Sequence, residues 1–296
     1  MTAATTSHRG RLRTGLYTSL ALAAFAANSI LCRVALRGDA IDATSFTAIR
    51  LVAGAATLWL LVGLRSGYSR DASPGDWFAA LALCVYAVGF SYAYLSLSAG
   101  TGALVLFGGV QLTMLAWGLR SGERPHPLQW IGLFAAASGL VTLVSPGVTA
   151  PSPGGAALMA SAGIAWGVYS LRGRGATDPA AATADNFLRA APLGLLLTLA
   201  ALPSAHATAQ GLGLAVVSGS LTSGIGYVIW YAALRGLTAT RAAVVQLAVP
   251  VLVAFAGILF LSEPISPRLV ISAVMILGGV ALTLIAKDRL VPSAKK

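Results

Sequence analysis

Ten long apolar stretches joined by short polar connections are the feature that most limits how this chain can fold. Each holds roughly 20 residues, enough for a helix to cross a hydrocarbon layer about 30 Å thick. Short connections make sequential helices antiparallel neighbours. We therefore predict an all-α integral membrane protein of ten transmembrane helices, with no soluble domain. The stretches are Thr14–Leu36, Ile41–Leu64, Trp77–Leu97, Gly102–Leu119, Pro127–Val144, Gly155–Leu171, Ala180–Leu202, Gly211–Leu234, Ala239–Leu261 and Pro267–Ala286.

The composition excludes an ordinary soluble domain. Apolar residues make up 57% of the 296 residues, charged residues only 10%, and the mean hydropathy is +0.80. The net charge of +11 could suggest a nucleic-acid partner, but the basic residues lie in short loops between apolar runs. We expect a lipid bilayer as the surroundings and no nucleic-acid partner. Cys32 and Cys84 lie inside apolar stretches, where they offer no disulfide framework or metal spacing.

The loop charges predict the orientation, because basic residues favour the cytoplasmic side. With a cytoplasmic N-terminus, only Arg37, Arg268 and the nearby Arg33 fall outside. We expect both termini to be cytoplasmic, in a bacterial-type inner (plasma) membrane. The first stretch is too long for a signal-peptide core and is taken as a membrane span. The basic residues placed inside are Arg9, Arg11, Arg13, Arg65, Arg70, Arg120, Arg124, Arg172, Arg174, Arg235, Arg241, Lys287, Arg289, Lys295 and Lys296.

The chain also resembles itself at an offset of 139 residues, which becomes 140 after one insertion. The matched pairs include Arg33 with Arg172, Thr44 with Thr183, Arg50 with Arg189, Tyr92 with Tyr231, Thr101 with Thr240, Glu123 with Glu263, and Pro127 with Pro267. We infer a duplication into a first five-helix repeat, 14–145, and a second, 155–287. An odd number of spans per repeat inserts the second repeat the opposite way up. The expected architecture is two inverted five-helix repeats around a central cavity, as in many secondary transporters.

Together these features resemble the EamA type of the drug/metabolite transporter (DMT) superfamily. Each half ends its fourth span with a family-like glutamate, in Gly122-Glu123-Arg124-Pro125 and in Ser262-Glu263-Pro264, and the sixth span carries Ala165-Trp166-Gly167-Val168-Tyr169. Within the superfamily the chain is most similar to the YddG-type exporters of aromatic amino acids and the dication paraquat. The resemblance implies a substrate cavity framed by spans 1, 3, 4, 6, 8 and 9. It also implies transport by alternating access.

Polar and aromatic residues at mid-membrane depth are the candidate substrate ligands, because such groups are costly in lipid unless paired or facing water. Amides could bind the ammonium and carboxylate groups of a substrate, and aromatic rings could stack on its flat part or face a cation. Hydrogen bonding and packing between helices is the alternative for each of them. The candidates are Asn28, Tyr86, Gln111, Trp166, Tyr169 and Gln246, followed by Tyr94, Tyr227 and Trp230 as further lining candidates.

Small residues and a proline supply candidate hinges. Gly163 and Gly167 form a GxxxG pattern, and Gly108 lies in the fourth span. Pro250 stands mid-span in the second half, where the first half has Gln111. We name Gly108, Gly167 and Pro250 as hinge candidates, with close local packing as the alternative.

Arg50 and Arg189 lie about two turns inside spans 2 and 7, where a buried arginine needs a partner. A structural pairing, with backbone carbonyls or a carboxylate such as Asp185, is favoured over substrate binding. No carboxylate or histidine lies at mid-membrane depth, so we expect facilitated or exchange transport rather than tight proton antiport.

The predicted function is export of small metabolites, aromatic amino acids first and cationic drugs second, by a monomer without cofactor or metal. Three alternatives stay open. The first is a DMT carrier for another metabolite or drug. A channel would need charge rings or aligned carbonyls, and an intramembrane enzyme would need a nucleophile and base or metal ligands at depth. Neither pattern stands out, so no catalytic residues are expected.

Overall fold

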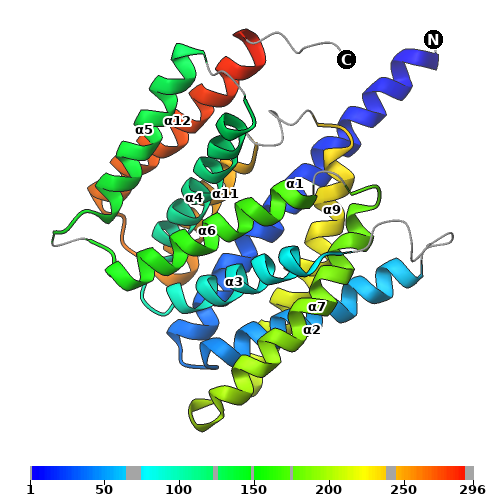
Figure 1. Cartoon of the computed structure of the whole chain (residues 1–296), viewed down its shortest axis with the longest axis vertical. Coiled ribbons are helices and arrows are strands. Elements are labelled where there is room, and N and C mark those ends of the chain that lie inside the picture. Colours follow the sequence, from blue (N-terminus) through cyan, green and yellow to red (C-terminus); the bar gives the residue numbers. More distant parts are fainter. Residues whose placement is uncertain are drawn as a thin grey trace.

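The computed structural model describes residues 2–64, 75–122, 126–147, 150–173, 176–237 and 245–290. In these ranges the regular structure is helical, apart from an isolated bridge between Ile41 and Ala207. Figure 1 shows the helices as one tilted bundle. They are α1 (Thr2–Arg37), α2 (Ala43–Gly63), α3 (Trp77–Ala93), α4 (Ala99–Arg120), α5 (Pro127–Val144), α6 (Pro153–Gly173), α7 (Pro179–Ala200), η1 (Leu202–Ser204), α8 (Ala209–Val217), η2 (Ser218–Ile225), α9 (Gly226–Leu234), α11 (Ala248–Leu261) and α12 (Pro267–Leu290).

The described chain forms ten long helical segments when α8, η2 and α9 are counted as the continuous segment that they make. Six of the ten are long and apolar enough to cross a membrane by themselves. The apolar segments in α3, α11 and α12 are shorter. The outward surface carries large apolar side chains such as Phe134, Phe255 and Phe260, which are 65%, 65% and 70% exposed. A surface of this kind needs lipid around it, so the protein is a multi-pass membrane protein.

Local sequence fixes where several helices begin. Asp42 and Asp76 precede α2 and α3, and their carboxylates accept hydrogen bonds from the amides of Ser45 and Ala79. Pro127 opens α5 where its missing N–H costs nothing. The predicted bounds of this fifth span match the helix, and most other bounds differ by a few residues.

The ninth predicted span, Ala239–Leu261, is interrupted in its described part. Residues 239–244 lie outside the described chain, Val245 and Gln246 are helical, Leu247 is a turn residue, and α11 begins at Ala248. Pro250 cannot donate a backbone hydrogen bond to Gln246, which explains why the helix does not run on through this point. Pro250 therefore stands in the first turn of α11 and not in the middle of a helix.

Helices from the two halves pack in matched pairs. In Figure 1, α5 lies beside α12 at one edge of the bundle and α2 beside α7 at the other. The packing of α3 on α6 corresponds to that of η2 and α9 on α1, and the packing of α4 on α6 to that of α11 on α1. Exchanging the halves thus preserves the main neighbours.

α1 and α6 run in opposite directions. The last turns of α1 reach the α3–α4 connection, since Arg33 donates to the Tyr94 carbonyl. The start of α6 lies at the same connection, because the Ser152 and Ser96 hydroxyls are 3.1 Å apart. α1 begins and α12 ends at the opposite end of the bundle, at the top of Figure 1.

Candidate functional site

A cavity of about 560 Å³ lies between α4, α6 and α9. Its volume is within the range of about 300–1,000 Å³ typical of small-molecule sites. The lining includes Gly173 at the end of α6, Asp178 just before α7, and Arg235 and Leu237 after α9. These four residues define the mouth end of the bundle. From there the cavity extends inward to Phe25 of α1 and to Gln246.

The inner wall of the cavity is aromatic. The ring of Trp166 lies 4.8 Å from that of Tyr86, 5.4 Å from Tyr169 and 5.2 Å from Tyr227, measured between centroids. Phe25 packs edge-on against Tyr227 and Trp230, at 5.9 and 5.7 Å. Such a wall presents flat apolar faces that suit a planar apolar group.

Three polar groups on this wall have no partner in the described chain. The side-chain amides of Gln111 and Gln246 and the indole N–H of Trp166 line the cavity without making a hydrogen bond to other described residues. Unpaired amides inside a membrane protein are costly unless water or a ligand satisfies them. The cavity therefore combines an apolar wall with free donors and acceptors.

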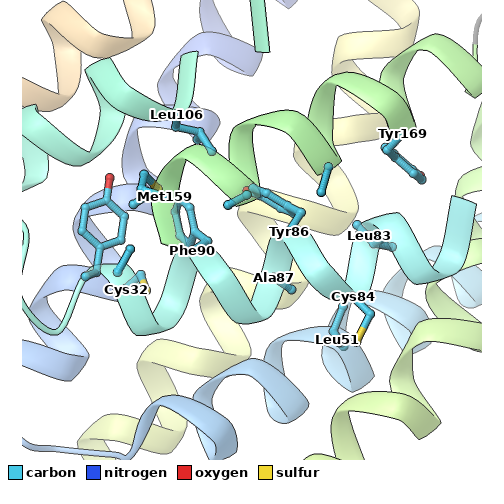
Figure 2. Close-up of a cluster of buried hydrophobic side chains, with 14 of the residues drawn as sticks. Cys32, Leu51, Leu83, Cys84, Tyr86, Ala87, Phe90, Leu106, Met159 and Tyr169 are labelled. Atoms are coloured by element: carbon cyan, nitrogen blue, oxygen red, sulfur yellow. The ribbon is translucent and has the colours of Figure 1, made fainter. Parts of the chain in front are cut away.

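A second, smaller chamber of about 30 Å³ lies deeper and shares Phe25, Trp166, Tyr227 and Gln246 with the cavity. Its other lining residues include Asn28, Tyr86, Phe90 and Thr222. Figure 2 shows Tyr86 and Phe90 on α3, next to α6 with Met159 and Tyr169.

Asn28 links α1 to the η2 segment. Its amide oxygen accepts hydrogen bonds from the hydroxyls of Ser218 and Thr222, at 2.7 and 3.1 Å. The amide nitrogen makes no hydrogen bond to the described residues. Of the two roles considered for Asn28, hydrogen bonding between helices thus falls to the amide oxygen. The amide nitrogen stays available for a ligand in the chamber.

Arg50 lies directly behind Tyr86 and is 2% exposed. Its Nη2 donates to the Tyr86 hydroxyl at 3.1 Å, and its Nε donates to Ser223 at 3.3 Å. The guanidinium carbon lies 5.2 Å from the centre of the Tyr86 ring and 5.0 Å from that of Phe90. The predicted pairing with a carboxylate or backbone carbonyl is wrong for Arg50. It holds for Arg189, which binds Asp185 at 2.6 Å.

An ionic cluster joins the helices at the opposite end of the bundle, which we call the sealed end. Arg33 binds Glu263 at 3.1 Å and donates to the Tyr94 carbonyl at 2.7 Å. The other carboxylate oxygen of Glu263 accepts from the Ala99 amide at 2.7 Å. Both charged side chains are largely buried, at 13% and 9% exposure. Arg33, Tyr94, Ala99 and Glu263 define the sealed end, which joins α1, α3, α4 and the residues after α11.

Eight of the nine predicted lining residues border one of the two spaces. Tyr94 does not: it is fully buried at the sealed end, against Phe90. The others belong to the cavity, the chamber or both, namely Asn28, Tyr86, Gln111, Trp166, Tyr169, Tyr227, Trp230 and Gln246.

The hinge candidates differ in their surroundings. A Cβ at Gly167 would lie 2.9 Å from the Thr113 Cβ, so this glycine lets α6 approach α4. A Cβ at Gly108 would meet nothing closer than 3.5 Å. Close packing thus accounts for Gly167 but not for Gly108.

The sequence predictions missed Phe25, Met114 and Thr222 as lining residues. Phe25 precedes Asn28 by three residues and so lies on the same helical face, a spacing that could have identified it. Thr222 carried no such signal, because it belongs to the η2 segment, where the α-helical period fails.

Comparison with known proteins supplies relatives but no substrate. The model of the EamA-like transporter family matches residues 13–145 and again 153–285. The chain is 53% identical over 274 residues to an uncharacterized protein of Pseudomonas aeruginosa, covering 92% of this chain and 94% of the relative. It is 26% identical over 288 residues to an uncharacterized transporter of Archaeoglobus fulgidus, covering 92% and 97%. A solved crystal structure has the same fold, with a TM-score of 0.67 at 22% identity over 94% of this chain and 99% of that one.

Proposed function

Since the chain belongs to the EamA-like transporter family of the DMT superfamily, we propose that it exports aromatic amino acids, as the YddG-type exporters do. The protein is a membrane transporter by its family and by its similarity to the archaeal transporter. The observation that carries the finer proposal is the composition of the cavity. Aromatic rings form one wall, and the free amides of Gln111 and Gln246 supply donors and acceptors beside it.

The proposed mechanism is alternating access between two inverted repeats, 14–145 and 155–287. The exchange of matched helix pairs, the opposite directions of α1 and α6, and the doubled family match all support it. Near-equivalent halves can exchange conformations, which closes one end of the site and opens the other. One chain supplies the whole lining, so we propose that a monomer is sufficient.

The proposed orientation puts the mouth end in the cytoplasm of a bacterial-type cell, because the loop arginines favour that side. In this state the site would load substrate from the cytoplasm while the Arg33–Glu263 cluster blocks the other exit. A cavity closed at one end favours a carrier over an open channel.

A second candidate substrate class is a flat cationic drug, which the aromatic wall could hold by cation–π contacts of about 0.5–2 kcal/mol per ring. Asp178 at the mouth end adds a carboxylate to the lining, which gives this candidate some electrostatic support.

Counterflow in proteoliposomes tests the aromatic amino-acid proposal. Trp166→Ala removes the ring shared by both spaces, and we expect about tenfold slower exchange of radiolabelled phenylalanine and tryptophan. Trp117→Ala is the matched control, because Trp117 lies on the outer surface of α4 at 56% exposure. Wild-type exchange by the Trp166 variant, or no saturable exchange of either amino acid by the wild type, would refute the proposal.

A further inference from the structure

We propose that the inner chamber binds the carboxylate of the substrate, through the hydroxyl of Tyr86 polarised by the positive charge of Arg50. The proposal rests on the transport function above and names the charged group that the same site recognises. It assigns Arg50 to substrate selection and not only to packing.

The charge of Arg50 has no opposite charge beside it. The ion pairs within the described chain join Arg33 to Glu263, Arg172 to Asp76, Arg189 to Asp185 and His206 to Asp39. Arg50 takes part in none of them, and its Nη1 is buried with no hydrogen-bond partner. Its two hydrogen bonds go to neutral hydroxyls, on Tyr86 and Ser223.

A buried, unpaired cation is costly, and proteins normally compensate it with a carboxylate or a polar network. Arg50 keeps its charge at all relevant pH values, so it cannot relieve this cost by losing a proton. An anionic group arriving in the adjacent chamber would supply the missing charge. Low dielectric makes that attraction stronger than at a surface.

Tyr86 is the link between Arg50 and the chamber. Because Arg50 donates to the Tyr86 oxygen, the phenolic O–H proton remains available for donation, and it makes no hydrogen bond to other described residues. A hydroxyl polarised in this way is a stronger donor to an anion. Asn28 can add a second donor, since only its amide oxygen is engaged.

The size of the chamber agrees with this assignment. A volume of about 30 Å³ holds about two water molecules, since each needs at least about 10–15 Å³. The two oxygens of one carboxylate need a similar space. The apolar part of the substrate would then lie in the larger cavity, against Trp166 and Tyr227, which line both spaces.

The positive charge of Arg50 also disfavours a cation in the chamber. The protein should therefore bind acids more tightly than amines of equal size. The probes are 3-phenylpropionate and hexanoate as acids, and phenethylamine and hexylamine as the matched amines. Binding to the purified full chain in detergent is measured by the shift of the unfolding midpoint at constant chloride. We expect at least one acid to stabilise the protein more than its matched amine does.

Variants of the two residues locate the effect. We expect Tyr86→Phe, which keeps the ring, to weaken acid binding about tenfold, as the loss of one charge-assisted hydrogen bond would. Arg50→Gln should remove the preference for acids over amines, while Arg50→Lys, which keeps the charge, should retain part of it. Tyr92→Phe on the same helix is the control, because Tyr92 is exposed on the outer surface and lines neither space.

Several outcomes would overturn the inference. They are amines that bind as tightly as the acids, no acid binding at all, equal stabilisation when chloride alone is titrated in a separate series, and an acid preference unchanged in both Tyr86→Phe and Arg50→Gln. Binding of hexanoate without 3-phenylpropionate would keep the inference but refute the aromatic substrate. The reverse failure, saturable phenylalanine exchange without preference for acids, would keep the transport proposal alone.

Discussion

The two ends of this bundle are built differently around equivalent arginines. At the sealed end Arg33 binds Glu263, and both side chains are nearly buried. At the mouth end Arg172, the match of Arg33 in the repeat, binds Asp76, and these side chains are 48% and 43% exposed. Glu123, the match of Glu263, lies outside the described residues. An arginine thus forms a largely buried ion pair at the sealed end and a half-exposed ion pair at the mouth end.

The contrast teaches that sequence equivalence does not give conformational equivalence. An ion pair removed from water depends strongly on both partners, whereas an exposed pair contributes little. If the halves exchange conformations during transport, the contribution of each of these two ion pairs to stability must differ between the two conformations. Variants at each end of the bundle can measure that difference.

The largest effect is expected from Glu263→Gln. Leaving Arg33 buried without its counter-charge should destabilise the sealed end by about 3 kcal/mol, more than about a hundredfold in population. Cys32, beside Arg33 and fully buried, is a native reporter. In a Cys84→Ser background we expect a membrane-impermeant maleimide to label Cys32 much faster in the variant. Equal labelling rates in two folded proteins would contradict the proposed seal.

A smaller effect is expected from Asp42→Ala, also at the sealed end. Burial alone would raise the pKa of Asp42, but hydrogen bonds from Ser45, Thr44 and the His206 amide lower it to about 2. The variant should lose about 1 kcal/mol of stability at neutral pH, as for other helix caps.

The pH dependence of this loss has a definite sign. Because the pKa of Asp42 is lowered on folding, its contribution is complete above the ordinary value near 3.8 and disappears as pH falls through about 2. Thermal unfolding in detergent along an acid series measures it. A difference from wild type that stays constant down to the lowest pH would exclude the cap as the cause.

Asp76→Asn should have a weaker effect at the mouth end. Asparagine can still cap α3 through Ala79, so the variant removes mainly the charge facing Arg172. We expect less than about 1 kcal/mol, because exposed pairs are screened by water and salt. The unfolding midpoint of the variant is compared with that of Glu263→Gln. A loss as large as for Glu263→Gln would erase the distinction between the two ends.

The smallest effect is expected from His206→Gln. A hydrogen bond with the Ser204 carbonyl and the nearby Asp39 carboxylate raise the pKa of His206. Its contribution should be complete below the ordinary value of about 6.5 and be lost as pH rises through the raised value. Unfolding midpoints at pH of about 5.5 and 8.5 measure this. A larger loss at the alkaline value would contradict the assignment.

Hydropathy predicted the helices well because each membrane span is a long apolar run with polar ends, a pattern set by the thickness of the bilayer. Counting along each span also placed Trp166, Gln111 and Gln246 among the candidates, and all three line the cavity. Depth does not specify the direction of a side chain. Tyr94 shares the helical stripe of Tyr86 and Phe90, yet it lies at the sealed end and away from both spaces.

Pairing across the bundle was harder to predict. The neutral partners of Arg50 come from α3 and η2, 36 and 173 residues away in sequence, and no local pattern joins them. The break at Leu247 is explained by Pro250. The sequence analysis placed this proline in the middle of a span and therefore did not predict a break beside it.

The π-helical turns of η2 give the segment 209–234 a built-in swivel. Such turns hold an additional residue, and when that excess moves along the helix each residue that it passes rotates by about 100° while the backbone bonds only change partners. Gly219 touches the Arg50 carbonyl, and Gly224 lies close to Thr57, so the swivel rests directly on α2. Tyr227 and Trp230 come directly after it in α9. A shift of the π-helical turns could therefore reorient aromatic side chains that contact a substrate while the segment stays helical.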